Sequence, residues 1–155
     1  MIRKRNDYEG FSLMELLVSV AILSISLGSW LGLFIYCSTF VDLSGNMTKA
    51  LRGAQGKLEE IRNHTYSLIT TDYAAGGSPG NKFDVTQLNG KGAVYIDSTN
   101  ANLLTVKVVV SWRNVNSRIT GEDLNLNGVL DAAEDKDGNG ELDSPVSLVS
   151  RIAQR

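Results

Sequence analysis

The chain has 155 residues, of which 43% are hydrophobic and 21% are charged, and its formal net charge is -2 at pH 7. This length has room for one membrane helix and one modest globular domain, which argues against a large enzyme. The weakly negative charge gives no indication of nucleic-acid binding. The only cysteine is Cys37, so the chain cannot form an intrachain disulfide.

A long apolar segment follows a short basic N-terminus. Residues 16–41 form a run of 26 residues without a formal charge or a proline. As a helix this run is about 39 Å long, at about 1.5 Å per residue, and it exceeds the bilayer core of about 30 Å. It is also longer than the apolar core of about 7 to 15 residues in a cleaved secretory signal. Because Arg3, Lys4 and Arg5 precede it, we expect a single membrane span with the N-terminus in the cytoplasm and the remaining chain outside.

One acidic side chain, that of Glu15, lies at the start of this apolar segment. A carboxylate at the centre of a bilayer costs about 2.5 to 3.5 kcal/mol on insertion scales, so Glu15 requires a partner. The sequence Gly-Phe-Ser-Leu-Met-Glu at residues 10–15, followed by the apolar run, resembles the leader of type IV prepilins and type II secretion pseudopilins. The alternative is a plain signal-anchor helix in which Glu15 lies near the lipid headgroups.

This resemblance implies that a prepilin peptidase cleaves the chain after Gly10 and that Phe11 becomes the N-methylated first residue. It also implies that Glu15 pairs with the N-terminal ammonium of a neighbouring subunit, because both charges are otherwise stranded in an apolar setting. The expected partners are other pilin or pseudopilin subunits, the prepilin peptidase and, before assembly, the inner membrane. The expected function is a minor type IV pilin-like subunit of a filament. A minor type II secretion pseudopilin and a non-polymerising, membrane-anchored calcium-binding module are the alternatives.

The chain divides into four expected segments: a leader peptide at 1–10, a transmembrane or filament-core helix at 11–41, an amphipathic helix half at 42–69, and a sheet domain at 70–155. Apolar residues at helical spacing form a predicted buried stripe in the third segment, namely Met47, Leu51, Ala54, Leu58 and Ile61. Charged residues between them, including Lys57, are expected on other faces. We expect the helix to end between residues 64 and 68.

The sheet domain begins after a glycine-rich loop at 72–81. Alternating sequence patterns predict strands at 83–88, 93–97, 103–112 and 145–153, with a hairpin turn at 89–92. Five residues of the third strand share one face: Leu104, Val106, Val108, Val110 and Trp112. The predicted fold class is therefore α+β, with a long N-terminal helix packed on an antiparallel sheet of about four strands.

An acidic insertion at 121–144 separates the last two predicted strands, and it contains a calcium-loop pattern. Residues 123–134 place oxygen-bearing side chains at positions 1, 3, 5, 9 and 12 of a twelve-residue loop, with a glycine at position 6 and a backbone carbonyl at position 7. Residues 135–143 repeat the first nine positions, but position 12 falls on Val146. The predicted ligands of a structural Ca²⁺ are Asp123, Asn125, Asn127, Val129, Asp131, Glu134, Asp135, Asp137, Asn139, Glu141 and Asp143.

Strands on both sides of the insertion argue against a helix-loop-helix EF-hand, and the loop resembles the calcium loops of dockerins. The incomplete second loop either binds weakly, shares ligands with the first loop, or only forms a turn. The alternative for both loops is a series of solvated Asn-Gly and Asp-Gly turns. With calcium bound, we expect the ends of the two flanking strands to be clamped.

No arrangement of nucleophile, base and orienting acid is present in the sequence, so we do not expect an enzyme. His64 is the only histidine, and its position near the predicted helix end indicates a surface or capping role.

Overall fold

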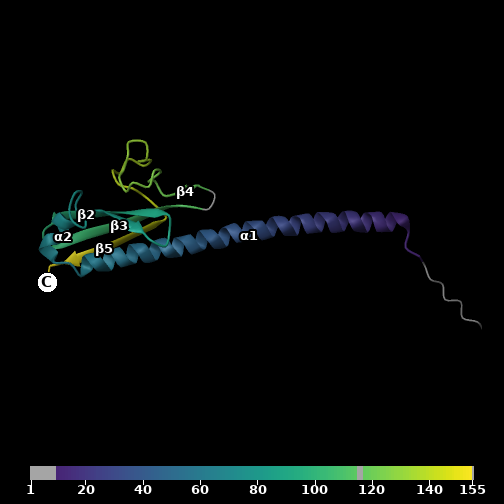
Figure 1. Ribbon diagram of the computed structural model, residues 1–155, viewed down its shortest axis with the longest axis horizontal. Coiled ribbons are helices and arrows are strands. Elements are labelled where there is room, and N and C mark those ends of the chain that lie inside the picture. Colours follow the sequence, from purple (N-terminus) through teal and green to yellow (C-terminus); the bar gives the residue numbers. More distant parts are fainter. Residues whose placement is uncertain (1–9, 115–116, 155) are drawn as a thin grey trace, which may run out of the picture. The chain divides into compact units, whose positions relative to one another are not determined.

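The computed structural model describes residues 10–114 and 117–154 (Figure 1). Its helices are α1 (Leu13–Arg62) and α2 (Tyr66–Asp72). Its strands are β1 (Lys82–Val85), β2 (Gly90–Asn100), β3 (Leu103–Arg113), β4 (Ile119–Thr120) and β5 (Val146–Ala153). The chain forms two compact units that divide between Val41 and Asp42, within α1.

The first unit consists of the apolar part of α1. Every described residue up to Val41 is exposed in the isolated chain. Within the described residues, α1 is the one helix long and apolar enough to cross a membrane. Its serine hydroxyls donate to carbonyls one turn earlier, as Ser19 does to Glu15 O at 2.7 Å and Ser24 to Val20 O at 2.8 Å. These bonds satisfy the hydroxyls inside the helix, so they do not oppose an apolar environment.

The second unit contains an antiparallel sheet centred on β3. β2 pairs with one side of β3 and β1 pairs with β2. β5 pairs with β3 from Leu103 to Val110, and β4 continues the same edge of β3 at Trp112 and Arg113. The predicted antiparallel sheet of about four strands is thus confirmed, with the two-residue β4 as an addition. Pairing of β5 with β3, and not with β4, leaves the insertion between β4 and β5 as an excursion from the sheet.

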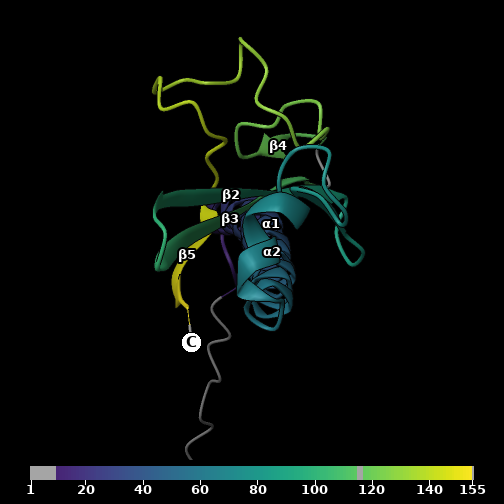
Figure 2. The same cartoon turned by 90° about the vertical axis from the view of Figure 1, so that its left-hand side faces the viewer.

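The core lies between the sheet and the helices. The predicted inward face of β3 is confirmed, since Leu104, Val106, Val108, Val110 and Trp112 are each at most 2% exposed. These side chains form one cluster with Ala50, Ala54, Leu58 and Ile61 of α1. Figure 2 shows that α1 and α2 cover the same face of the sheet, and Ile69 and Tyr73 close the core at that end. The predicted α+β architecture is therefore confirmed.

The predicted stripe of α1 is confirmed at Ala54, Leu58 and Ile61, but its first half is wrong. Met47 and Leu51 are each 39% exposed, whereas Ala50 and Lys57 are buried. Small residues determine this face, because they let the sheet come close: a Cβ added to Gly53 would lie 2.9 Å from Val85 Cγ1. Met47 and Leu51 are therefore only half-buried, whereas Leu58 and Ile61 are part of the core.

Lys57 was expected on another face of α1, but its side chain is only 7% exposed. Its Nζ lies 2.8 Å from Glu60 Oε1, and it stands 5.1 Å from the centroid of the Tyr73 ring and 5.6 Å from that of Phe83. The Tyr73 hydroxyl donates to the same Glu60 oxygen at 3.0 Å. The ion pair and the two ring faces compensate the buried charge, while the aliphatic stem adds to the core.

Three predicted boundaries are wrong. α1 ends at Arg62, and the separate helix α2 was not predicted. The first strand ends at Val85, and the turn at residues 86–89 precedes β2, which begins at Gly90. Gly92 is therefore a strand residue paired with Phe83, and the Phe83 ring occupies the space that a Cβ at Gly92 would need. The glycine makes room for an aromatic ring and does not form the turn.

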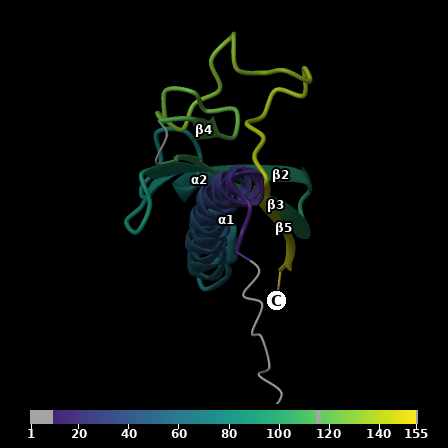
Figure 3. The same ribbon diagram turned by 90° about the vertical axis from the view of Figure 1, so that its right-hand side faces the viewer.

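The insertion covers part of the opposite face of the sheet from α1, as Figures 2 and 3 show. Leu142 is 2% exposed, and its N–H donates to the Tyr95 hydroxyl of β2 at 2.8 Å. Val109 and Ser111 of β3, which alternate with the core residues, are also buried. The second face of the sheet is therefore only partly exposed to solvent.

Candidate functional site

The first loop of the insertion folds around the carboxylate of Asp123, which is 1% exposed. Its Oδ1 accepts a hydrogen bond from Asn127 N at 3.0 Å and its Oδ2 accepts one from Gly128 N at 2.7 Å. Gly128 has a φ of 72°, a left-handed conformation that favours glycine. Calcium loops have a glycine at the sixth position because the backbone turns sharply there, and Gly128 makes this turn.

The other predicted side-chain ligands of this loop converge with Asp123. Glu134, at 3% exposed, accepts hydrogen bonds from Leu124 N at 2.7 Å and from Asp131 N at 3.1 Å. The Asp131 carboxylate in turn meets the side-chain amides of Asn125 at 2.6 Å and Asn127 at 3.1 Å. Five oxygen-bearing side chains from one loop therefore gather, and an all-oxygen donor set of this kind suits Ca²⁺.

The second loop repeats this arrangement at its start. Asp135 accepts hydrogen bonds from Gly138 N at 2.7 Å, Asn139 N at 3.1 Å and Gly140 N at 3.1 Å. The Asn139 side-chain amide reaches both Asp137 and Asp143, each at 2.8 Å. The structure therefore brings the predicted aspartates and Asn139 of this loop together.

Lys107 of β3 anchors the second loop to the sheet. Its Nζ lies 2.9 Å from Glu141 Oε2 and 3.0 Å from Asp143 Oδ1. Burial would lower the pKa of Lys107, but the two carboxylates outweigh it and raise that pKa. The hydrogen bond from Lys107 lowers the pKa of Asp143 despite some desolvation. The Glu141 carboxylate is thus engaged with the sheet, which leaves its backbone carbonyl for the role that position 7 has in a calcium loop.

Sequence reasoning missed Glu122, which lies directly before the first loop. One carboxylate oxygen from each of Glu122, Asp137 and Asp143 falls within a group whose members are at most 4.8 Å apart. Glu122 is 9% exposed. The signal that could have revealed it is the repeated Glu-Asp pair at 122–123 and 134–135.

The predicted processing and assembly residues lie at the start of α1. Gly10, Phe11 and Ser12 precede the helix, and Glu15 is in its first turn. Phe11 is 81% exposed. Within the described residues no ion pair involves Glu15. The remainder of the predicted leader, residues 1–9, lies outside the described residues.

Comparison with known families places a recognised motif on this segment: the prokaryotic N-terminal methylation motif matches residues 5–31. The chain carries the signature of type IV pilin and pseudopilin precursors. The matched residues include Gly10, Phe11 and Glu15, together with the first 16 of the 26 residues of the apolar run. No curated protein and no solved structure matches the chain significantly. The motif and the apolar α1 fit a membrane-anchored subunit of the pilin type.

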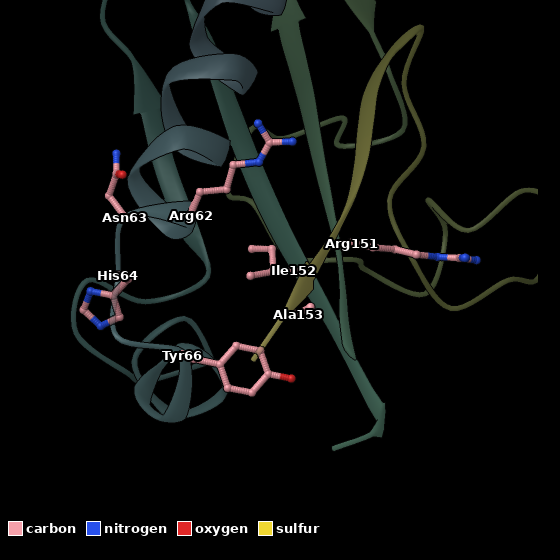
Figure 4. A pocket seen from close by; sticks show the side chains of 7 residues that line it. All are labelled: Arg62, Asn63, His64, Tyr66, Arg151, Ile152 and Ala153. Atoms are coloured by element: carbon pink, nitrogen blue, oxygen red, sulfur yellow. The ribbon is translucent and has the colours of Figure 1, made fainter. Parts of the chain in front are cut away.

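At the far end of the sheet domain, a surface pocket of about 680 Å³ lies between the end of α1 and β5. Its lining consists of Arg62, Asn63, His64, Tyr66, Arg151, Ile152 and Ala153 (Figure 4). His64 Nε2 lies 2.7 Å from Asp72 Oδ2, and its ring packs edge-on against Tyr73. His64 thus ties α2 to the end of α1.

The absence of enzymatic activity stays a prediction.

Proposed function

We propose that this chain is a minor pilin-like structural subunit that is cleaved after Gly10, methylated on Phe11 and assembled into a pilus or pseudopilus. The match of residues 5–31 to the methylation motif carries this proposal. The exposed apolar surface of α1 up to Val41 supports it, because such a surface requires lipid or other apolar helices around it. A single-pass location in the inner membrane before assembly, with the C-terminal domain outside the cytoplasm, follows from the same proposal.

Electrostatics gives Glu15 its role in assembly. Cleavage creates an ammonium group at Phe11, four residues from Glu15. In a bundle of staggered helices, the Glu15 carboxylate of one subunit meets the ammonium of its neighbour, and both charges are neutralised in an apolar setting. The apolar side chains of the helix have apolar surroundings both in the lipid and in the bundle, so they do not favour one stagger over another. The charge pair therefore sets the register between subunits.

Incorporation into filaments tests the role of Glu15. We expect Glu15→Gln to insert into the membrane and to be cleaved like the wild type, but to fall at least tenfold in sheared filament fractions. Asp42→Asn removes a charge from an exposed position farther along α1 and should assemble normally. Normal incorporation of Glu15→Gln would contradict the role of the charge pair, and a chain that never enters filaments would favour the non-polymerising anchored module.

A type II secretion pseudopilin shares the motif and the assembly chemistry, so it remains the alternative within this proposal. Complementation separates the two: we expect the gene to restore piliation, and not secretion, in a strain that lacks its minor pilins. The opposite result would assign the chain to the secretion system.

We further propose that the insertion binds Ca²⁺ through the loop from Asp123 to Glu134, with a second ion in the loop that begins at Asp135. Two buried carboxylates support this proposal, since Asp123 and Glu134 are at most 3% exposed. Within the described residues, neither forms an ion pair with a cationic side chain. Buried charges in proteins are usually paired or bound to metals, and the all-oxygen set around them suits calcium. The ion would have a structural role.

Thermal unfolding of the full chain in detergent tests the calcium proposal. We expect saturating Ca²⁺ to raise the Tm of the domain, because an ion that binds only the folded state stabilises it by about 2.7 kcal/mol at a hundredfold excess over Kd. Asp123→Ala should reduce this shift, while Asp97→Asn, an exposed acid on β2, should keep it. An identical Tm with Ca²⁺ and with a chelator would contradict the proposal.

A further inference from the structure

The second loop of the insertion has no acidic side chain at its own twelfth position. That position is Val146, the first residue of β5, which is 5% exposed and belongs to the hydrophobic core. A calcium loop normally closes with a bidentate glutamate at this place. The second loop is therefore complete only if another part of the chain provides the carboxylate.

Glu122 contacts the second loop in the way that a glutamate at its twelfth position would. Its Oε1 accepts a hydrogen bond from Lys136 N at 3.3 Å and its Oε2 accepts one from Asp143 N at 3.1 Å. These donors are the second and ninth positions of the second loop. Glu134 accepts from Leu124 N and Asp131 N, the second and ninth positions of the first loop.

The backbone shows the same correspondence. Glu134 N donates to Asp131 O at 2.9 Å, and Glu122 N donates to Asp143 O at 2.8 Å. Each glutamate thus makes the same contacts to the ninth residue of one loop, although Glu134 is the last residue of its loop and Glu122 precedes both loops.

Charge and burial point to a cation between these groups. Glu122 is more than nine-tenths buried, and within the described part of the chain no cationic side chain pairs with it. Its carboxylate lies within 4.8 Å of ligand oxygens of Asp137 and Asp143. The Lys107 ammonium offsets the charge of Asp143, but Glu122 and Asp137 add two further negative charges, which are repelled unless a second cation lies between the three carboxylates.

We propose that Glu122 is the closing ligand of the second loop and that the insertion is a two-ion unit. This inference rests on the proposed calcium binding by the first loop. Each Glu-Asp pair then provides one ligand to each site. Glu122 is the twelfth-position ligand of the second loop and Asp123 is the first ligand of the first loop. Glu134 is the twelfth-position ligand of the first loop and Asp135 is the first ligand of the second. Because Glu122 follows β4 by two residues and Asp143 precedes β5 by three, the second ion clamps the two strands where the insertion leaves the sheet.

Counting bound ions tests the assignment. Equilibrium dialysis of the full chain in detergent against radioactive Ca²⁺ should give two ions for the wild type, and one each for Glu122→Gln and Glu134→Gln. Asp137→Asn changes an exposed residue of the second loop and should lose the same ion as Glu122→Gln. Glu59→Gln is the matched control, since it changes an exposed acid of α1 that pairs with Arg62 outside the insertion, and it should keep both ions.

The outcomes separate the two proposals. A wild type that binds no Ca²⁺ refutes calcium binding itself. A wild type that binds one ion, lost in Glu134→Gln and kept in Glu122→Gln, leaves the first site intact and overturns the role of Glu122. Two ions bound to Glu122→Gln would also overturn the role of Glu122, because neither site would then need its carboxylate. No bound ion in this variant would overturn it as well, because both sites would then depend on the carboxylate. One bound ion in each of Glu122→Gln and Asp137→Asn would support the assignment even if the second loop loosens in both variants.

Discussion

Lys57 shows how one residue can depart from the face that its type predicts. Its Nζ contacts Glu60 and lies over the rings of Tyr73 and Phe83. We expect Lys57→Ala to lower the free energy of unfolding by about 1 to 3 kcal/mol, because it removes a buried stem and the cation over two rings. Lys49→Ala, at an exposed position of the same helix, should change it by less than about 0.5 kcal/mol. Equal effects in chemical denaturation would show that Lys57 is not part of the core.

Tyr73 gives a pH dependence with a defined sign. Burial of the phenol and its hydrogen bond to Glu60 raise the pKa of Tyr73 to about 12, compared with about 10 in an unfolded chain. A raised pKa means that this contribution to stability is complete below pH of about 10 and is lost as pH rises towards about 12. The measurement is the tyrosinate absorbance of the wild type and of Tyr73→Phe. Tyr73→Phe should lose the tyrosine that titrates last, and loss of a tyrosine that titrates near 10 would contradict the assignment.

At the scale of the elements, the contact between α1 and the sheet depends on two glycines in different ways. A Cβ at Gly53 would press on Val85, whereas nothing lies within 4 Å of one at Gly56. We expect Gly56→Ala to stabilise the domain by up to about 1 kcal/mol through helix propensity. Gly53→Ala gains the same propensity but suffers overpacking, which typically costs about 1 to 3 kcal/mol, so it should be neutral or destabilising. Thermal unfolding of both variants tests this, and equal stabilisation by the two would refute the close approach.

Sequence patterns predicted those elements whose periodicity is strong. The alternation in β3 gave its inward face correctly because five large apolar residues all need burial. The stripe of α1 was predicted correctly at Ala54, Leu58 and Ile61 but not at Met47 and Leu51. The pattern weights large side chains, whereas close packing selected Ala50 and Gly53 at the start of the contact. Gly92 was misassigned to a turn because its role depends on the Phe83 ring of a neighbouring strand. Such a contact is set by register, which a single sequence does not specify.

At the scale of the whole chain, the two functional segments were predictable to different depths. Residues 10–15 and the apolar run are contiguous in sequence, so the methylation motif could be recognised without a fold. The first calcium-type loop is also contiguous, and the structure gathers its side chains. Glu122 reaches Asp143 across 21 residues, and only folding of the insertion brings these two residues together. Groups of residues that are contiguous in sequence could be predicted, and the contact between Glu122 and the second loop, which forms only on folding, could not.

Cleavage after Gly10 is the central claim, because the charge pair at Glu15 depends on a new N-terminus at Phe11. The most direct measurement is mass spectrometry of the full chain purified from cells that express a prepilin peptidase, with Gly10→Val as an uncleavable comparison. We predict a mature chain that begins at Phe11 and carries one methyl group on its amino terminus. Recovery of the wild-type protein with Met1 still attached, in the presence of an active peptidase, would contradict the account.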